Sequence, residues 1–213
     1  MSVQNIIPAF ALYGEHDQFP DVIHIEDFSV RAPIHDWRIL PHRHSQMSQL
    51  FMVKTGRIEA RTDEENHVIG MGDFLYIPEH CVHEFVFKPG SQGKIFSYPV
   101  SVVRTVSPST DQVASALSRT FAGSVDAPLK QTTQMLDDIA GGSGPFRAQQ
   151  IMGMAHSVLA HLADISISDV APDQMPKHSR LFALDELIAQ NLSTGWSASD
   201  FAKALSLSTG HLS

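Results

Sequence analysis

The sequence predicts an α+β protein in which a small β-barrel comes first and helices follow. As far as Val106, the chain consists of short segments rich in β-branched and aromatic residues, separated by Gly, Pro, Asp and Asn. From about Pro108 the apolar residues recur at helical spacing instead. With 213 residues, of which 43% are hydrophobic, the chain is long enough to bury a core in one domain or two modest ones.

Composition narrows the classes of protein. The formal net charge of −8 argues against a chain wrapped broadly around nucleic acid, but it leaves room for a small nucleic-acid module at one end. The single cysteine, Cys81, excludes an internal disulfide and fits a reducing compartment. No apolar run approaches the roughly 20 residues of a membrane span, and the N-terminus lacks the features of a secretory signal. We therefore expect a cytoplasmic protein with no membrane partner.

The strands of the predicted barrel are marked by turn residues. Residues 57–62 are predicted to form a strand, 63–66 a polar hairpin loop and 67–69 the returning strand. A turn at 70–73, a short apolar strand at 74–77 and Pro78 follow.

Three histidines and one amide are predicted to meet inside this barrel. His42 and His44 share one face of an extended strand, Gln49 follows after a tight turn, and His83 arrives from a distant strand. Three buried neutral imidazoles without partners cost roughly 1–3 kcal/mol each, whereas one divalent ion satisfies all of them. Hydrogen-bonded core histidines are the alternative interpretation.

The spacing of these residues resembles the two motifs of the cupin family. The matching segments are residues 41–56 (PHRHSQMSQLFMVKTG) and 72–87 (GDFLYIPEHCVHEFVF), with Gly56, Gly72 and Pro78 at motif positions. The resemblance implies a double-stranded β-helix barrel and a divalent metal (Zn, Ni, Fe or Mn) held by His42, His44, Gln49 and His83. Gln49 stands where many cupins have Glu, His80 where they have Gly, and Phe87 where they have Asn. Gln is a weaker ligand than a carboxylate, so the metal site would carry less negative charge.

The second half of the chain predicts three helices, at 109–122, 127–140 and 146–165, the last two joined by the glycine-rich segment 141–145. The third helix carries a broad apolar stripe, formed by Ile151, Met154, Ala155, Val158, Leu159, Leu162 and Ile165. The stripe either closes the chain's own core or forms a homodimer contact through Ile151, Met154, Val158 and Leu162.

A proline-punctuated linker precedes the C-terminal segment. An amphipathic helix at 181–192 is followed by a short helix that Ser197 and Asp200 begin as a capping box. A turn at 206–207 leads to Ser208, which can cap another helix. This arrangement is typical of a helix-turn-helix.

Residues 196–205 (WSASDFAKAL), with Ser208 and residues 211–213, resemble the first half of the DNA-binding module of AraC-type transcription regulators. In that family an effector-binding cupin-like barrel and a dimerising hairpin precede two helix-turn-helix units. The resemblance divides the chain into an effector-binding barrel (1–107), a dimerisation hairpin (108–168), a linker (169–179) and an incomplete helix-turn-helix (180–213). It implies operator DNA as a partner of the full-length chain, with contacts from Ser208, Thr209, Gly210, His211 and Ser213. It also implies that the chain is truncated within the reading helix, so that this fragment does not bind DNA specifically.

The resemblance favours a ligand-responsive regulator that is not an enzyme. Residues 7–15 (IPAFALYGE) are similar to the PobR-like branch of the family, whose effectors are hydroxylated aromatic acids. The predicted effector-binding residues are Trp37, Arg38, Phe51, Tyr76 and Phe85, with Arg38 as the carboxylate partner. By strand parity, at most one of Trp37 and Arg38 points inward. A metal-dependent cupin enzyme, such as a dioxygenase or isomerase acting on a small acid, is the alternative function. A dimerising fragment with an empty barrel is the third interpretation.

Overall fold

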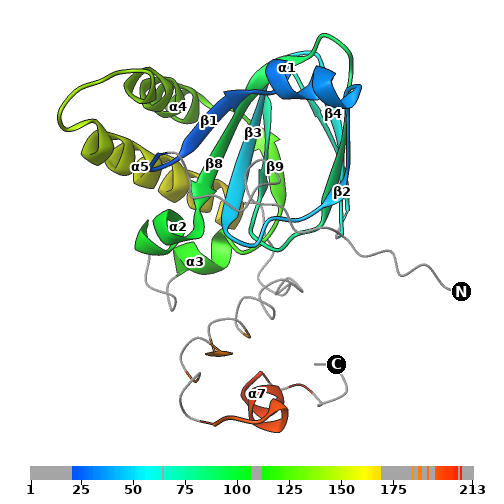
Figure 1. Ribbon diagram of the computed structural model, residues 1–213, viewed down its shortest axis with the longest axis vertical. Coiled ribbons are helices and arrows are strands. Elements are labelled where there is room, and N and C mark those ends of the chain that lie inside the picture. Colours follow the sequence, from blue (N-terminus) through cyan, green and yellow to red (C-terminus); the bar gives the residue numbers. More distant parts are fainter. Residues whose placement is uncertain are drawn as a thin grey trace, which may run out of the picture. The chain divides into compact units, whose positions relative to one another are not determined.

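A computed structural model of the chain describes residues 21–63, 65–106, 112–168 and 195–205, together with positions 184, 187, 188, 191 and 207. It divides into two units, Met1–Asp169 and Val170–Ser213. The first unit contains two β-sheets followed by helices (Figure 1), which confirms the predicted α+β class.

Both sheets are antiparallel, and most neighbouring strands in them are not consecutive in the sequence. The five-stranded sheet has the order β1 (His24–Asp27), β8 (Gln92–Pro99), β3 (Met47–Thr55), β6 (Asp73–Ile77) and β9 (Phe121–Ser124). The four-stranded sheet has the order β2 (Arg38–His42), β7 (His83–Phe87), β4 (Arg57–Thr62) and β5 (Asn66–Gly70). The predicted strands at 57–62 and 74–77 are therefore confirmed, and the return strand extends one residue beyond 67–69 at each end.

Side chains alternate between the two faces of the five-stranded sheet, as the pleat of a strand requires. On β3, Phe51 and Val53 belong to the core between the two sheets, whereas Leu50 and Met52 belong to a second core on the opposite face. Both faces of this sheet are thus buried. The space between the sheets is the barrel interior, which the buried side chains of Ile58, Ile69, Leu75, Phe85, Phe87 and Ile95 help to fill.

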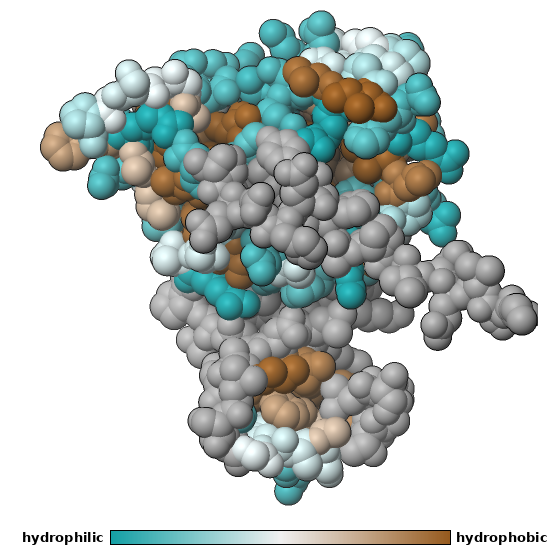
Figure 2. Space-filling view, in the orientation of Figure 1, coloured by the Kyte–Doolittle hydropathy of each residue, from teal (hydrophilic) through white to brown (hydrophobic). Residues whose placement is uncertain are grey.

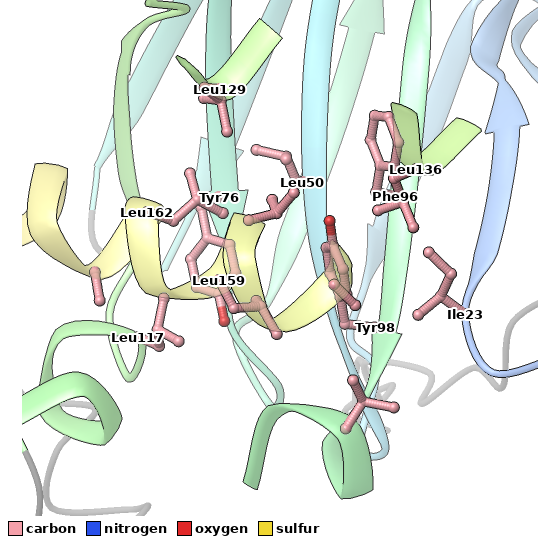
Figure 3. Close-up of a cluster of buried hydrophobic side chains, with 14 of the residues drawn as sticks. Ile23, Leu50, Tyr76, Phe96, Tyr98, Leu117, Leu129, Leu136, Leu159 and Leu162 are labelled. Atoms are coloured by element: carbon pink, nitrogen blue, oxygen red, sulfur yellow. The ribbon is translucent and has the colours of Figure 1, made fainter. Parts of the chain in front are cut away.

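The second core lies between the five-stranded sheet and a helical hairpin. Helices α4 (Ala127–Ala140) and α5 (Arg147–Ser168) pack there, and Leu129 and Leu159 are fully buried. Figure 3 shows their leucines against Tyr76 and Tyr98 of the strands. Asp126 begins α4 by accepting a hydrogen bond from the Leu129 amide at 2.8 Å. The predicted hairpin is confirmed, and its apolar stripe closes the chain's own core.

This packing corrects the predicted dimer surface. Ile151, Val158 and Leu162 are all 0% exposed, and Met154 is partly buried against the same core. Side chains that the chain buries against itself are not available to a second copy, so the predicted contact through these residues is wrong, although a homodimer through another surface stays a prediction. Strongly exposed apolar side chains occur elsewhere, at Val30 and Ile34 (67% and 75% exposed), and Figure 2 shows an apolar area over α1 (Phe28–Arg31).

The predicted helix at 109–122 is only partly correct. Within the part of this range that the structure describes, Gln112–Ala116 form a short helix, α3, and the chain then continues into β9. Phe121 pairs with Tyr76 along the edge of β6, with ring centroids 5.2 Å apart. The free edge of β6 therefore outweighs the local helical period, because pairing satisfies backbone groups that a helix end would leave open.

Three helical segments were not predicted from the sequence. They are α1, the 3-10 turn at Ala32–His35 and α2 (Val100–Val106). In α2 most residues are β-branched and have low helix propensity, but Val102 is buried in the second core. Tertiary packing overrides the propensity here.

In the second unit, the structure describes a helix α7 (Ala198–Ala204) that begins at the predicted Ser197. The Ser197 amide donates to the Asp200 carboxylate at 2.8 Å, so the capping interaction is confirmed. The predictions for residues 7–15, the linker 169–179 and the DNA-contacting residues 208–213 lie outside the described residues. Among the described residues, no helix is both long and apolar enough to cross a membrane.

Candidate metal centre

The structure brings three of the predicted ligands together. His42 ends β2 and lies directly opposite His83, the first residue of β7, while His44 lies in the connection to β3. All three are buried, with exposed fractions of 6%, 7% and 2% for His42, His44 and His83. Their ring centroids are separated by 4.3 to 5.4 Å, and one ligand atom from each lies within 4.8 Å of the others.

A β-bulge turns His42 toward the barrel interior. On β7, His83 and Phe85 are two residues apart and share a face. Their partners on β2, His42 and Ile39, are three residues apart, and the register shifts between them. The extra residue restores the inward orientation of His42, a role that bulges often have near functional sites. The prediction that His42 and His44 share one regular strand is therefore corrected, since the strand ends at His42.

Hydrogen bonds fix the tautomers of two imidazoles. His42 Nδ1 lies 2.8 Å from the Leu40 carbonyl oxygen, and His83 Nδ1 lies 2.9 Å from the Cys81 carbonyl oxygen. A carbonyl oxygen only accepts, so each Nδ1 donates its proton, and each Nε2 is the unprotonated nitrogen of the neutral ring. Metal-binding histidines use the same arrangement, in which a backbone carbonyl orients the ring through the other nitrogen.

The Nε2 atom of His83 provides the test of whether a metal fits. It is buried and has no hydrogen-bond partner among the described residues. An unpaired buried acceptor costs about 1–3 kcal/mol, and a cation is the partner that an unprotonated imidazole nitrogen can bind. The donor set of His42, His44 and His83 therefore fits a divalent transition metal.

The electrostatics keep the site ready for a cation. Burial, reinforced by the neighbouring His42 and His44 rings, lowers the pKa of His83 well below its usual value. Burial also lowers the pKa of His42, against the opposing effect of its hydrogen bond to Leu40. Both imidazoles are therefore neutral at pH 7, and no proton has to leave before a metal binds.

A strained residue positions His44. His80 occupies the position where the cupin motif has glycine, and its φ is +64°, in the left-handed region that glycine favours. Its amide donates to the His44 carbonyl oxygen at 2.6 Å. The sequence signal for this role was the missing glycine, but only the structure shows what the residue holds. Such strain often accompanies functional sites.

Gln49 lies on β3, in the sheet that faces the strands of His42 and His83. It is buried, and its side-chain amide donates to Ser97 Oγ at 3.2 Å. That bond leaves the amide oxygen as the atom that can accept or ligate. The role of Gln49 as a metal ligand stays a prediction.

The predicted effector-binding residues fall into different places. Phe51 and Phe85 meet in the barrel interior with ring centroids 4.5 Å apart, and Trp37 packs partly buried against the same core. Tyr76 belongs instead to the core between sheet and helices, because strand parity sends it to the opposite face from Leu75 and Ile77. Arg38 is exposed on β2. The assignments of Tyr76 and Arg38 to the barrel wall are therefore wrong.

Comparison of the sequence with protein-family models supports the cupin interpretation of the barrel. Residues 29–97 match the family model described as the Cupin domain. The chain contains a cupin domain. Among solved structures, the AraC-like transcriptional activator CuxR is 12% identical, with a TM-score of 0.47, and the alignment covers 79% of this chain and 59% of that one. ToxT from Vibrio cholerae is 7% identical with a TM-score of 0.47, covering 88% of this chain and 72% of that one.

A third structure, KdgF from Halomonas sp., is 29% identical over 28% of this chain and 57% of its own length, with a TM-score of 0.27. The chain thus spans less than two thirds of CuxR and of KdgF. No curated protein matches the sequence significantly. Ligands and DNA targets do not transfer over such distances, and the functional argument rests on the residues of the cupin domain.

Proposed function

We propose that this chain is the sensing part of a ligand-responsive transcription regulator whose cupin barrel binds a small aromatic acid next to a divalent metal ion. The observation that carries the sensing half is the unpartnered Nε2 of His83, directed into an interior that also contains aromatic rings. A metal held by His42, His44 and His83 would supply a Lewis-acidic centre that attracts a carboxylate.

The walls of the barrel suit the body of such an acid. Phe85 lies 5.3 Å from His83 and 4.5 Å from Phe51, measured between ring centroids. Aromatic rings pack favourably on one another in offset or edge-to-face arrangements, beyond the contribution of buried area. Histidines at one end of an aromatic wall favour a ligand with one charged group and one apolar ring.

The regulatory half of the proposal rests on the order of the parts. A cupin domain, a helical hairpin and a capped helix starting at Ser197 follow one another, in the order that the resemblance to AraC-type regulators implies. By the same resemblance, Ser208, Thr209, Gly210, His211 and Ser213 would contact operator DNA. Effector binding can then shift the DNA-binding arrangement only by as much as the effector prefers one arrangement over the other.

A metal-dependent cupin enzyme is the second candidate. The specific observation in its favour is a cluster of three histidine ligands, since catalytic metal sites keep three protein ligands and leave a position open for substrate. In that case the chain would convert a small acid instead of sensing it.

Metal content and ligand-dependent melting separate these candidates. We expect about one equivalent of divalent metal by elemental analysis, lost in His83→Ala, and a rise in melting temperature with 4-hydroxybenzoate as the first probe of an aromatic acid library. Phe51→Ala should reduce the rise, and Arg38→Ala, at an exposed site, is the matched control that should leave it unchanged.

The test of DNA binding uses a chain with the two helix-turn-helix units that the resemblance to AraC-type regulators implies. We expect it to bind a specific operator with an affinity that the acid changes. Turnover of the acid by the metal-loaded protein, together with DNA binding that shows no sequence preference, would replace the regulator by the enzyme. A metal-free protein that no acid stabilises would contradict both.

A further inference from the structure

We propose that the cupin unit has a second ligand site, a groove between α4 and the five-stranded sheet that binds a small amphipathic carboxylate. Residues of β3, β8 and α4 line most of the groove, together with Asp27 at the end of β1. Figure 1 shows how these elements are arranged in the cupin unit. It is built by side chains outside the histidine cluster and does not depend on a metal.

The register of β3 places the groove and the histidines at different ends of the barrel. Gln49 pairs with Ile77 and Ser97 near one end, where the His80 amide contacts His44 and the Val100 amide donates to Gln46. Met52 and Val53, which line the groove, pair with Lys94 and Gly93 near the other end. At about 3.3 Å per residue, the four steps from Gln49 to Val53 correspond to roughly 13 Å.

The groove has the size and the floor of a small-molecule site. Its volume is 690 Å³, within the range of roughly 300–1,000 Å³ that ligand pockets have. Met52, Phe96 and Val125 provide apolar surface from two strands and the start of the α4 segment. At Gly72, which has φ of +84°, a Cβ would meet no atom within 4 Å, so this wall is open. An apolar body the size of a short alkyl chain fits such a space.

The charges on the rim favour an anion. The lining contains Lys54, Lys94 and Lys130 against Asp27 and Asp137, three positive charges less two negative, although the whole chain carries a net charge of −8. Lys94 bridges both carboxylates, at 3.4 Å from Asp27 and 3.1 Å from Asp137. One ammonium group offsets one of these two negative charges, so the net positive charge of the lining comes from the other two lysines.

The two remaining lysines have no opposing carboxylate. Lys54 and Lys130 are exposed, and neither forms an ion pair with any residue that the structure describes. Ammonium groups beside an apolar floor match a ligand with a carboxylate at one end and a hydrocarbon body at the other. Lysine is a flexible point charge, so the site suits a single carboxylate without demanding a bidentate geometry.

The test uses octanoate as the probe and octan-1-ol as its uncharged counterpart. The chain is labelled with ¹³C on the methionine methyl groups, and resonances are assigned by Met→Leu variants. We expect octanoate to shift the signals of Met52 and Met71, which line the groove, and to leave Met47 at the other end of β3 unchanged. We expect octan-1-ol to bind at least five-fold more weakly.

Variants decide whether the lysines carry the affinity. Lys130→Glu and Lys54→Glu, both at exposed positions, should each weaken octanoate binding by five-fold or more, and Lys88→Glu, an equal charge change outside the groove, should not. His83→Ala should leave binding unchanged, which separates this site from the proposed effector site. Equal affinity for octan-1-ol, unaltered binding by both lysine variants, a shift of Met47 in place of Met52, or no binding at all would overturn the proposal.

Discussion

Tyr98 is expected to destabilise the fold through its hydroxyl group. Its ring is buried between sheet and helices, as Figure 3 shows, and its Oη has no hydrogen-bond partner among the described residues. Burial raises its pKa far above that of a free tyrosine. Tyr98→Phe keeps the packing of the ring and removes only the unsatisfied oxygen.

The expected gain follows from the cost of an unpaired hydroxyl. A buried polar group without a partner costs about 1–3 kcal/mol, and the lost contacts of one oxygen atom offset part of that. Tyr98→Phe should therefore raise the free energy of unfolding by about 1 kcal/mol. In a domain of about 150 residues this corresponds to a rise of about 4 °C in melting temperature.

Urea unfolding followed by tryptophan fluorescence measures this change. The chain has two tryptophans, one in each unit, so a Trp196→Phe background leaves Trp37 as the reporter of the cupin unit. Tyr76→Phe is the matched comparison. The Tyr76 hydroxyl also lacks a hydrogen-bond partner of good geometry among the described residues. Burial raises its pKa, but an interaction with Ser48 acts in the opposite direction, so the gain in Tyr76→Phe should be smaller. A loss of stability in Tyr98→Phe would refute the reasoning, because it would mean that the hydroxyl is bonded.

Three further changes test other parts of the structure. Burial raises the pKa of Glu26, but hydrogen bonds and charges from His24 and Arg31 outweigh burial, so the net pKa is lowered. The ionised carboxylate therefore stabilises the fold above pH 4–5, and this stabilisation is lost as the pH falls through the folded-state pKa. Glu26→Gln should therefore destabilise the protein at pH 7 and cease to do so near pH 3, and urea midpoints with a constant difference across pH would contradict this. His80→Gly should relieve about 1 kcal/mol of left-handed strain and lose part of it to chain entropy, for a net gain of about 0.5 kcal/mol. Calorimetry measures both this variant and His80→Ala, which keeps a Cβ at the positive φ and should give no gain in stability. A clear loss of stability in His80→Gly would count against the strain. Leu159→Ala should cost about 3 kcal/mol in urea unfolding, since the side chain is 0% exposed in the second core, and a loss below about 1 kcal/mol would show that the core is looser than described.

The candidate metal centre could be predicted in part. The spacing of His42, His44 and His83 was sufficient to indicate that they converge, because it coincides with a known motif. Their hydrogen bonds could not be predicted, because the acceptors are backbone carbonyls of Leu40 and Cys81, whose direction depends on the bulge and on the turn before β7. The placement of Arg38 on the outside follows from the same local geometry.

The sequence by itself determined the order of a strand-rich first part and a helical hairpin, the limits of α4, the cap at Ser197 and the residues of the histidine cluster. These features depend on turn residues, helical period and side-chain chemistry, all of which are local. Tertiary structure decided which way the ambiguous segments went. Residues 121–124 became β9 because β6 offered an unpaired edge, α2 formed from β-branched residues because Val102 is buried, and the stripe of α5 covered the sheet of its own chain. The physical reason is that hydrogen bonding along a strand edge and burial of apolar area involve partners far away in the sequence, and their free energies exceed the small differences in local propensity.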